Sequence, residues 1–207
     1  MLRLQQAEAQ SKGLFLVTVA SHGLTVQGGD FLVAADTLWD HIPHPAVAVS
    51  QFLDQVATTE AQRCLVLLDA CRERLWAGQR GRRGAAAEPM SESFANAIAS
   101  ASGLAMLAAT TRGGFAYDDL ARMNGVFTAA VIDGLSGEAA ADDQGFITVG
   151  TLAVYVQKRV VAWVRAHRKD DAWCSKGIGR QIEGDAEALP LVVKELVREV
   201  SGSYRDR

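Results

Sequence analysis

The sequence predicts an α/β fold in which a mainly parallel central sheet is flanked by helices on both faces, giving three layers. Apolar runs at 14–19 and 64–68 are short, continuous and bounded by polar residues, as strands buried on both faces are. Residues 46–61 carry apolar side chains at helical spacing, and a longer helix is expected from Thr148 to His167. This alternation of strands and helices favours a layered α/β architecture.

Other segments complete the predicted order of elements. A short polar helix is expected at 2–11, and the turn at 27–30 joins the first strand to an extended piece at 31–35 in a hairpin-like arrangement. We expect a helix at 91–101, a strand at 104–109, a polar loop at 110–124 and a buried helix at 126–135. A turn at 142–145 and a last strand at 189–193 follow.

Composition excludes several classes of function. The chain of 207 residues is predicted to be a single domain, and its 49% of hydrophobic residues suits a globular protein. A net charge of -3 provides no basic surface for nucleic acid, and no apolar run approaches the length of a membrane span. The first residues lack the apolar core of a signal peptide. Three cysteines without a CxxC pair argue against a disulfide framework or a zinc site, so we expect a cytoplasmic protein.

Two short motifs carry the functional information. Ala-Ser-His-Gly at 20–23 and Asp-Ala-Cys-Arg at 69–72 each follow a predicted strand. If those strands are parallel neighbours, His22 and Cys71 meet at the same edge of the sheet. A thiol with a base within reach is what nucleophilic catalysis by cysteine requires. The two residues lie 49 positions apart, close to the spacing of roughly 50 between the histidine and the cysteine of caspases.

With these motifs the chain resembles the bacterial caspase-like peptidases, which form one clan with metacaspases and animal caspases. Ser-His-Gly at 21–23 resembles the histidine motif of that clan, and 69–72 resembles its cysteine motif. Segments 107–119, 124–130 and 145–149 resemble the small-subunit half of bacterial members. The resemblance covers about residues 10–193 and implies a caspase-like sandwich, with a large-subunit-like part at 1–77, a linker at 78–90 and a small-subunit-like part at 91–207.

The resemblance also implies roles for individual residues. Cys71 would be the nucleophile of a cysteine endopeptidase, and His22 its base and acid. The backbone amides of Gly23 and Cys71 would form the oxyanion hole, which usually contributes the largest electrostatic stabilisation in acyl transfer. The substrate would be a protein or peptide, and this chemistry needs neither a metal nor another cofactor.

Asp69 points to the substrate preference. Animal caspases have a glutamine two residues before the cysteine, whereas metacaspases have an aspartate there and accept arginine or lysine. A carboxylate in a partly desolvated site favours a guanidinium, so we expect cleavage after Arg, then Lys. Asp118 or Asp119 would add a second carboxylate, and the sequence leaves open which. Asp69 could instead cap a helix or bind backbone amides.

Three arginines follow the cysteine motif in a polar stretch that is expected to form a flexible loop. Arg80, Arg82 and Arg83 lie where caspases have their inter-subunit linker. Such a loop is a good protease target, and we therefore expect cleavage there to activate the enzyme as a zymogen. The alternative is a solvated loop with no such role.

The start of the chain departs from the family pattern, because a strand, helix, strand and helix normally precede the histidine strand. We expect one edge of the strand at 14–20 to be unpaired, and such an exposed edge can pair with another chain or promote aggregation. Three explanations are open: a missing upstream segment, a misassigned start codon, or a strand supplied by a partner chain. The missing upstream segment is favoured.

The main alternative function is a catalytically inactive caspase-like scaffold or regulatory interaction module. An α/β hydrolase is excluded by the lack of a Gly-x-Ser-x-Gly elbow. Taken singly, Cys71 could be a buried core cysteine, as Cys64 is expected to be. Asp142 and Asp143 are interpreted as a turn rather than a calcium site.

Overall fold

The computed structural model describes residues 14–26, 29–34, 36–37, 46–59, 63–72, 105–111, 116–168, 177–182 and 184–197, without the side chains of 24–26 and 71–72. Several predictions lie outside these residues, namely the helices at 2–11 and 91–101 and the linker at 78–90 with its three arginines.

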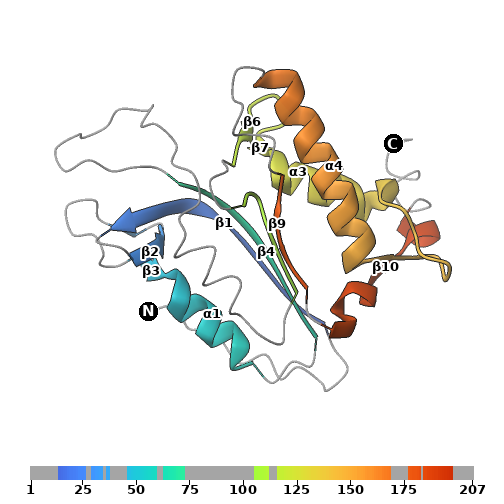
Figure 1. The fold of residues 1–207 in the computed structure, drawn as a ribbon, viewed down its shortest axis with the longest axis horizontal. Coiled ribbons are helices and arrows are strands. Elements are labelled where there is room, and N and C mark those ends of the chain that lie inside the picture. Colours follow the sequence, from blue (N-terminus) through green and yellow to red (C-terminus); the bar gives the residue numbers. More distant parts are fainter. Residues whose placement is uncertain are drawn as a thin grey trace.

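A six-stranded mixed sheet forms the centre of the fold, in the order β3-β2-β1-β4-β5-β9 (Figure 1). Its strands are β1 (Leu14–Val26), β2 (Gly29–Leu32), β3 (Val47–Ala48), β4 (Arg63–Arg72), β5 (Ala105–Ala108) and β9 (Gly179–Gln181). The central strands β1, β4 and β5 are parallel, whereas β2 and β9 run antiparallel to their neighbours β1 and β5. The predicted α/β class with a mainly parallel core is therefore confirmed.

Helices cover the two faces of this sheet. Helix α1 (Val49–Ala57) lies on one face, and α3 (Val126–Asp133) and α4 (Val149–His167) lie on the other (Figure 1). A π-helical turn, η2 (Gly134–Glu138), continues α3, and a 3-10 helix, η4 (Gly184–Ala188), precedes the last strand. Two small antiparallel pairs complete the fold: β6 (Asp118–Asp119) with β7 (Asn124–Gly125), and β8 (Phe146–Thr148) with β10 (Pro190–Val193).

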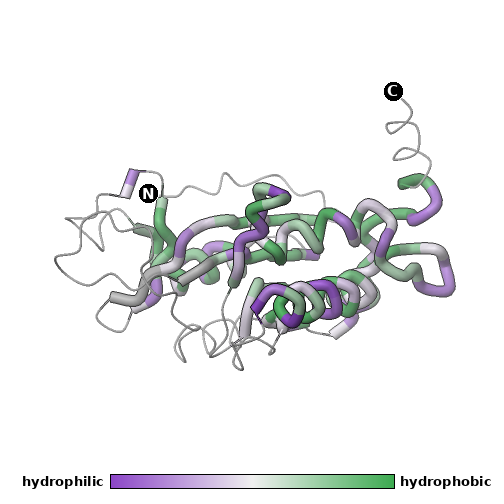
Figure 2. The backbone as a smooth tube through the Cα atoms, turned by 90° about the horizontal axis from the view of Figure 1, so that it is seen from above, coloured by the Kyte–Doolittle hydropathy of each residue, from purple (hydrophilic) through white to green (hydrophobic). Residues whose placement is uncertain are grey.

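Strand β4 is buried on both faces, which explains its continuous apolar sequence. Leu65 and Leu67 pack into the core on the α3–α4 side, whereas Cys64, Val66 and Leu68 pack into the core on the α1 side. Hydrophobic residues are accordingly concentrated along the central strands (Figure 2). Burial raises the pKa of the Cys64 thiol to about 11, so this cysteine has the core role expected of it.

Strand β1 is covered on one face only. Phe15, Val17 and Val19 pack against the α1-side core, but Leu14 and Leu16 on the opposite face are 38% and 47% exposed. Within the described residues, the pairing of 14–22 is with β4, and β2 joins the other edge only from Gly23 onwards. The expected unpaired edge at 14–20 agrees with this pairing.

Strands β1 and β4 and the segment at 110–124 differ from the sequence-based expectation. Strands β1 and β4 run further than predicted and include His22 and Cys71, because backbone pairing with β2 and between β1 and β4 continues beyond the apolar side chains. The polar loop predicted at 110–124 contains the short β6–β7 hairpin.

None of the helices among the described residues combines the length and apolarity needed to cross a membrane.

Helix α4 begins at a complete capping box. The Thr148 hydroxyl accepts from the Thr151 backbone N–H at 3.2 Å, and the Thr151 hydroxyl accepts from the Thr148 backbone N–H at 3.0 Å. Thr148 is buried, so these backbone groups have little water as an alternative partner.

We therefore expect Thr148→Ala to lower the free energy of unfolding by about 1 kcal/mol, measured by urea denaturation. Thr58→Ala is the matched control, because the exposed Thr58 hydroxyl donates to the Gln55 carbonyl at the end of α1 and caps no N–H. Its effect should stay within about 0.5 kcal/mol. Equal losses in the two variants would show that the capping box contributes nothing specific.

Candidate functional site

The parallel ladder between β1 and β4 brings the two sequence motifs together. The two strands pair in unbroken register from Leu14–Arg63 to Gly23–Arg72, and His22 is the register partner of Cys71. Adjacent strands lie about 4.8 Å apart, so the two backbones are neighbours at this point. Their juxtaposition follows from backbone pairing alone.

The backbone at His22 is held from both sides. Beyond the β4 ladder, the His22 carbonyl accepts from the Val33 N–H at 2.9 Å. The Ser21 hydroxyl donates to the Val33 carbonyl at 2.7 Å and lies 3.0 Å from the His22 carbonyl. Gly23 is buried and is in register with both Arg72 and Leu32. The His22 side chain itself is exposed, so the strand end presents an imidazole to solvent on a fixed backbone.

Asp69 is a buried acidic group two residues before Cys71. Its Oδ2 accepts hydrogen bonds from the Thr128 backbone N–H, at 3.2 Å, and from the Thr128 hydroxyl. Thr128 is the third residue of α3, and the residue before that helix is Gly125, which has no side chain to cap it. Asp69 therefore satisfies a helix N-terminal donor from a neighbouring strand, in the way an N-cap side chain would.

The electrostatic setting of Asp69 is unfavourable for its charge. Desolvation by burial raises the pKa of this carboxyl, the two hydrogen bonds from Thr128 oppose that rise, and the charge of Asp118 adds to it. A carboxylate in such a setting is stabilised by any cation that reaches it.

A short hairpin at 118–125, formed by β6 and β7, lies against Asp69. Asp118 is in register with Gly125, and Asp119 with Asn124. Gly125 lies so close to Asp69 that a side-chain Cβ at this position would collide with the carboxylate. Glycine is thus required here by the close approach of the hairpin to β4.

The two aspartates of the hairpin have different surroundings. Asp118 is exposed and acts electrostatically on Asp69. Asp119 accepts from the Trp163 indole N–H at 3.2 Å and from the Ala121 backbone N–H at 3.1 Å. These contacts favour Asp118 over Asp119 as the second carboxylate near Asp69, a choice that the sequence leaves open.

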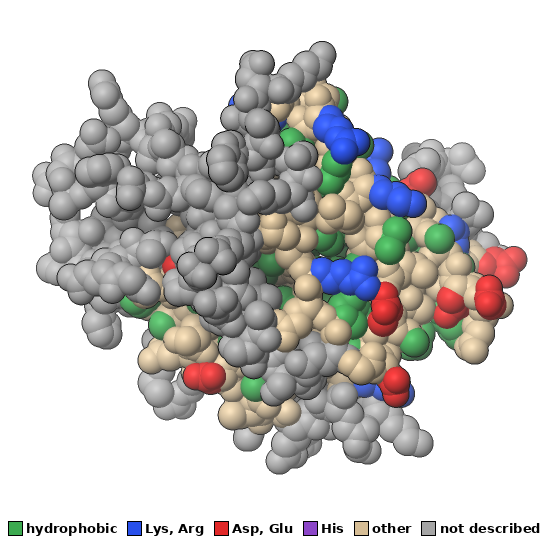
Figure 3. Space-filling model, in the orientation of Figure 1, with side chains coloured by type: hydrophobic (Ala, Val, Ile, Leu, Met, Phe, Trp, Pro, Cys, Tyr) green, Lys and Arg blue, Asp and Glu red, His purple; other side chains and the backbone are tan. Residues whose placement is uncertain are grey.

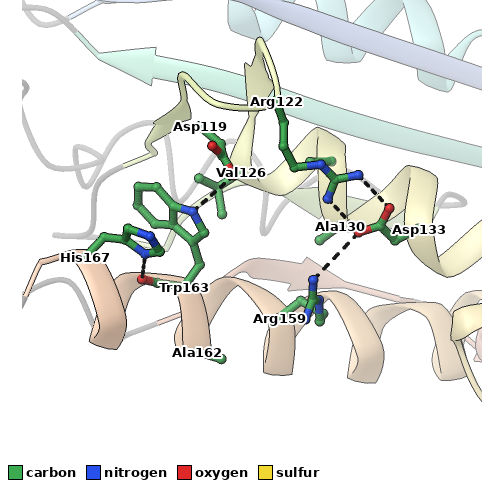
Figure 4. Close-up of a pocket in the computed structure, with 10 residues that line it drawn as sticks. Asp119, Arg122, Val126, Ala130, Asp133, Arg159, Ala162, Trp163 and His167 are labelled. Carbon is green, nitrogen blue, oxygen red and sulfur yellow. Dashed lines mark hydrogen bonds and ion pairs between the residues drawn. The ribbon is translucent and has the colours of Figure 1, made fainter.

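A cavity of about 280 Å³ lies beside the hairpin, between α3 and α4 (Figure 4). Asp119 and Arg122 of the hairpin, Asp133 of α3, and Arg159, Trp163 and His167 of α4 line it over a floor of small apolar residues. In the space-filling view, basic and acidic side chains lie next to each other on the α4 side of the molecule (Figure 3). Among the described residues no cluster of three or more metal-ligating side chains occurs.

Several of these residues are not predicted as site residues from the sequence. They lie in the predicted polar loop, at its junction with the buried helix, in that helix and in the longer helix from Thr148, namely Arg122, Gly125, Thr128, Asp133 and Trp163. One signal was available: a helix that begins after Asn-Gly needs a cap from elsewhere, and Asp69 supplies it. Asp142, in contrast, behaves as predicted, because its carboxylate accepts from the backbone N–H groups of Gln144 and Phe146 within the turn.

Known proteins with a caspase domain are similar to this chain. A family model described as the caspase domain matches residues 1–183. The crystal structure of caspase-1 from Spodoptera frugiperda is similar with a TM-score of 0.48 and 15% identity, over 81% of this chain and 59% of that chain. The chain thus spans less than two thirds of the length of that caspase. A search of curated proteins found no match. Because the family model covers most of its length, the chain belongs to the caspase domain family, whose members are cysteine peptidases.

Proposed function

We propose that this chain is a cysteine endopeptidase in which Cys71 is the nucleophile and His22 the general base and acid. The observation that carries the proposal is the parallel register that pairs His22 with Cys71. Residues in register across a parallel ladder belong to the same face of the pleat, as a dyad needs. Membership of the caspase domain family supports the same chemistry.

The proposed reaction follows from these groups. His22 takes the thiol proton, and the Cys71 thiolate attacks the carbonyl carbon of the scissile peptide bond. The backbone amides of Gly23 and Cys71 stabilise the oxyanion, each donor by roughly 3–4 kcal/mol. His22 then protonates the departing amine as the C–N bond breaks, and water hydrolyses the thioester to release the acid and regenerate the thiol.

We further propose that the enzyme cleaves after Arg, then Lys. The carboxylate pair of Asp69 and Asp118 supports this preference, because two like charges that approach each other favour a cation between them. A guanidinium can donate two parallel hydrogen bonds to a carboxylate, whereas an ammonium interacts as a point charge. Burial of Asp69 strengthens such an interaction.

The alternative function is an inactive scaffold or regulatory interaction module of the same fold. The contact of Asp69 with the α3 backbone favours a structural role for that residue, since capping alone would account for its hydrogen bonds. Activity measurements separate the two functions.

The purified chain should hydrolyse a fluorogenic arginyl peptide faster than the lysyl analogue, and both much faster than an aspartyl analogue. Cys71→Ala should abolish turnover, and His22→Ala should lower kcat by about 10²–10⁴-fold because general acid–base catalysis is lost. An arginyl chloromethyl ketone should label the wild-type chain, with the adduct located by mass spectrometry.

Cys64→Ala is the matched control for Cys71→Ala. Its thiol is buried, with a pKa of about 11, so the variant should keep both turnover and labelling. A folded wild-type chain that neither hydrolyses these peptides nor reacts with the ketone would instead establish the scaffold function. Preference for the aspartyl peptide would refute the specificity alone.

The pH dependence of kcat/KM should report on Asp69. Burial raises the pKa of this carboxyl above the ordinary aspartate value of ~3.9. As pH falls, the ionised form that binds a guanidinium is therefore lost at a higher pH than it would be for an ordinary aspartate. The arginyl substrate should therefore lose kcat/KM at a higher pH than its neutral citrulline isostere, measured between pH 4 and 8.

Asp69→Asn separates charge from capping, since an amide oxygen can still accept from Thr128. We expect it to lower kcat/KM for the arginyl peptide about 10- to 100-fold, as for loss of a charged hydrogen bond. The pKa of Asp69 is higher in the folded chain than in the unfolded chain, so ionisation of Asp69 lowers the free energy of unfolding at pH values above the unfolded pKa. Asp69→Asn cannot ionise, and its melting temperature at pH 7 should therefore be no lower than that of the wild-type chain. A lower melting temperature with unchanged kcat/KM would assign Asp69 to capping only.

We also propose that the linker at 78–90 is cut after Arg80, Arg82 or Arg83 during activation. Intact-mass analysis of incubated wild-type chain should show fragments that end at these residues, and Cys71→Ala should remain whole if cleavage is autocatalytic. Replacement of all three arginines by Gln is expected to prevent the cut. An active enzyme that stays intact would remove this proposal.

A further inference from the structure

The hairpin that carries Asp118 has little to hold it in place by itself. It contains two register pairs, and its four-residue turn exposes Leu120 by 82% and Met123 by 86%. Met123 adopts a left-handed conformation, with φ of 53°, which is uncommon for a residue other than glycine. A two-stranded hairpin of this size is marginal alone, so its position depends on contacts with other elements.

The first of these contacts is a bidentate ion pair. The Arg122 guanidinium at the turn donates two hydrogen bonds of 2.7 Å to the two carboxylate oxygens of Asp133, near the end of α3 (Figure 4). Arg159 of α4 approaches the same carboxylate at 3.8 Å. Exposed ion pairs usually add little stability, but a bidentate geometry with a third charge restricts orientation.

The second contact comes from α4. The Trp163 indole N–H donates to Asp119 Oδ2, at 3.2 Å, while Asp119 Oδ1 accepts from the Ala121 N–H within the turn. The indole is itself held by stacking on His167, with ring centroids 4.4 Å apart at 17°. Asp119 thus links the base of the hairpin to a fixed aromatic side chain.

Between these two contacts lies the cavity of about 280 Å³, lined by residues of the hairpin, α3 and α4. Small apolar side chains also line it, namely those of Val126, Ala129, Ala130 and Ala162; Figure 4 shows Val126, Ala130 and Ala162. Where side chains do not fill the space between two elements, van der Waals packing cannot fix their distance. The polar contacts at Asp133 and Trp163 therefore have a larger part in placing the hairpin.

We propose that Asp133 and Trp163 are positioning residues that hold the 118–125 hairpin, so that Asp118 stands over Asp69 and the carboxylate pair receives one basic side chain. This inference rests on the proposed specificity for basic residues. Neither residue touches the substrate. Their loss should weaken binding of the arginyl side chain while the Cys71 thiol keeps its reactivity.

Asp133→Asn and Trp163→Phe test the proposal with small changes of shape. Each should raise KM for the arginyl peptide about tenfold with little change in kcat, since small misplacements have large effects on binding geometry. The ratio of kcat/KM for arginyl over lysyl peptides should fall towards one, because the two-point guanidinium contact needs both carboxylates in place. Alkylation of Cys71 by iodoacetamide should proceed at the wild-type rate.

A charge exchange shows whether the ion pair itself is responsible. Arg122→Asp and Asp133→Arg should each impair arginyl binding, and the double variant should recover a large part of it. Glu187→Gln is the matched control, because it removes an exposed ion pair with Arg180 elsewhere in the molecule and should change nothing. The proposal would be overturned if Asp133→Asn and Trp163→Phe kept the wild-type KM and selectivity. It would also be overturned if these variants lost both the alkylation of Cys71 and kcat.

Hydrogen exchange of the peptide at 116–126 gives a readout that does not need turnover. The Val126 N–H donates to the Tyr117 carbonyl at 2.8 Å and closes the base of the hairpin. Its exchange should be faster in both variants and return towards the wild-type rate in the charge exchange. Unchanged exchange overturns the positioning role even if the enzyme is active. Faster exchange in a chain that cleaves no basic substrate supports the positioning of the hairpin and refutes the proposed function.

Discussion

The parallel backbone ladder between β1 and β4 is the constraint on which the candidate site depends. Its register aligns ten residues of each strand, and the last pairs contain His22, Cys71 and Gly23. A shift by one position would move His22 to the opposite face of the pleat from Cys71. The core enforces this register, because Phe15, Val17 and Val19 on β1 must face the same apolar layer as Cys64, Val66 and Leu68 on β4.

Asp69 joins the sheet to the elements that shape the site. From β4 it reaches the first turn of α3, and the hairpin at 118–125 approaches it closely enough to require glycine at 125. Burial of this carboxylate raises its pKa and so opposes its ionisation, while the hydrogen bonds from the hydroxyl and the backbone amide of Thr128 lower the pKa and partly compensate. Through its Oδ2 this carboxylate organises the helix terminus, and in the proposed function it would also receive a cation. In the proposed function, structure and specificity would therefore be coupled at Asp69.

The two sides of the sheet differ in how they are completed. On the α3–α4 side, β4 and β5 are covered by a large core that includes the buried face of α4. Leu14 and Leu16 of β1 lie on that side too, and they remain more than a third exposed. The hairpin also lies there, linked to α3 and α4 through charged and aromatic side chains around a cavity. Around the cavity, polar contacts therefore join the hairpin to α3 and α4, whereas apolar packing covers β4 and β5.

The sequence by itself determined the parts of the protein that local patterns encode. Continuous apolar runs marked β1, β4 and β5, the spacing of apolar residues marked α1 and α4, and Thr148 marked the start of α4. The two motifs placed His22 and Cys71 after apolar strands, and their resemblance to caspases identified the family that the comparison confirmed. Asp69 was recognised because it adjoins the cysteine.

Tertiary structure alone decided how these parts meet. The hairpin at 118–125 has only two pairs of residues and no apolar alternation, so no periodicity could reveal it. The difference between Asp118 and Asp119 arises because Trp163, 44 residues away in the chain, engages only the second. The cap of α3 comes from Asp69, 59 residues before Thr128. Such contacts depend on the packing of α3 and α4 against the sheet, which pairs residues that local sequence cannot relate.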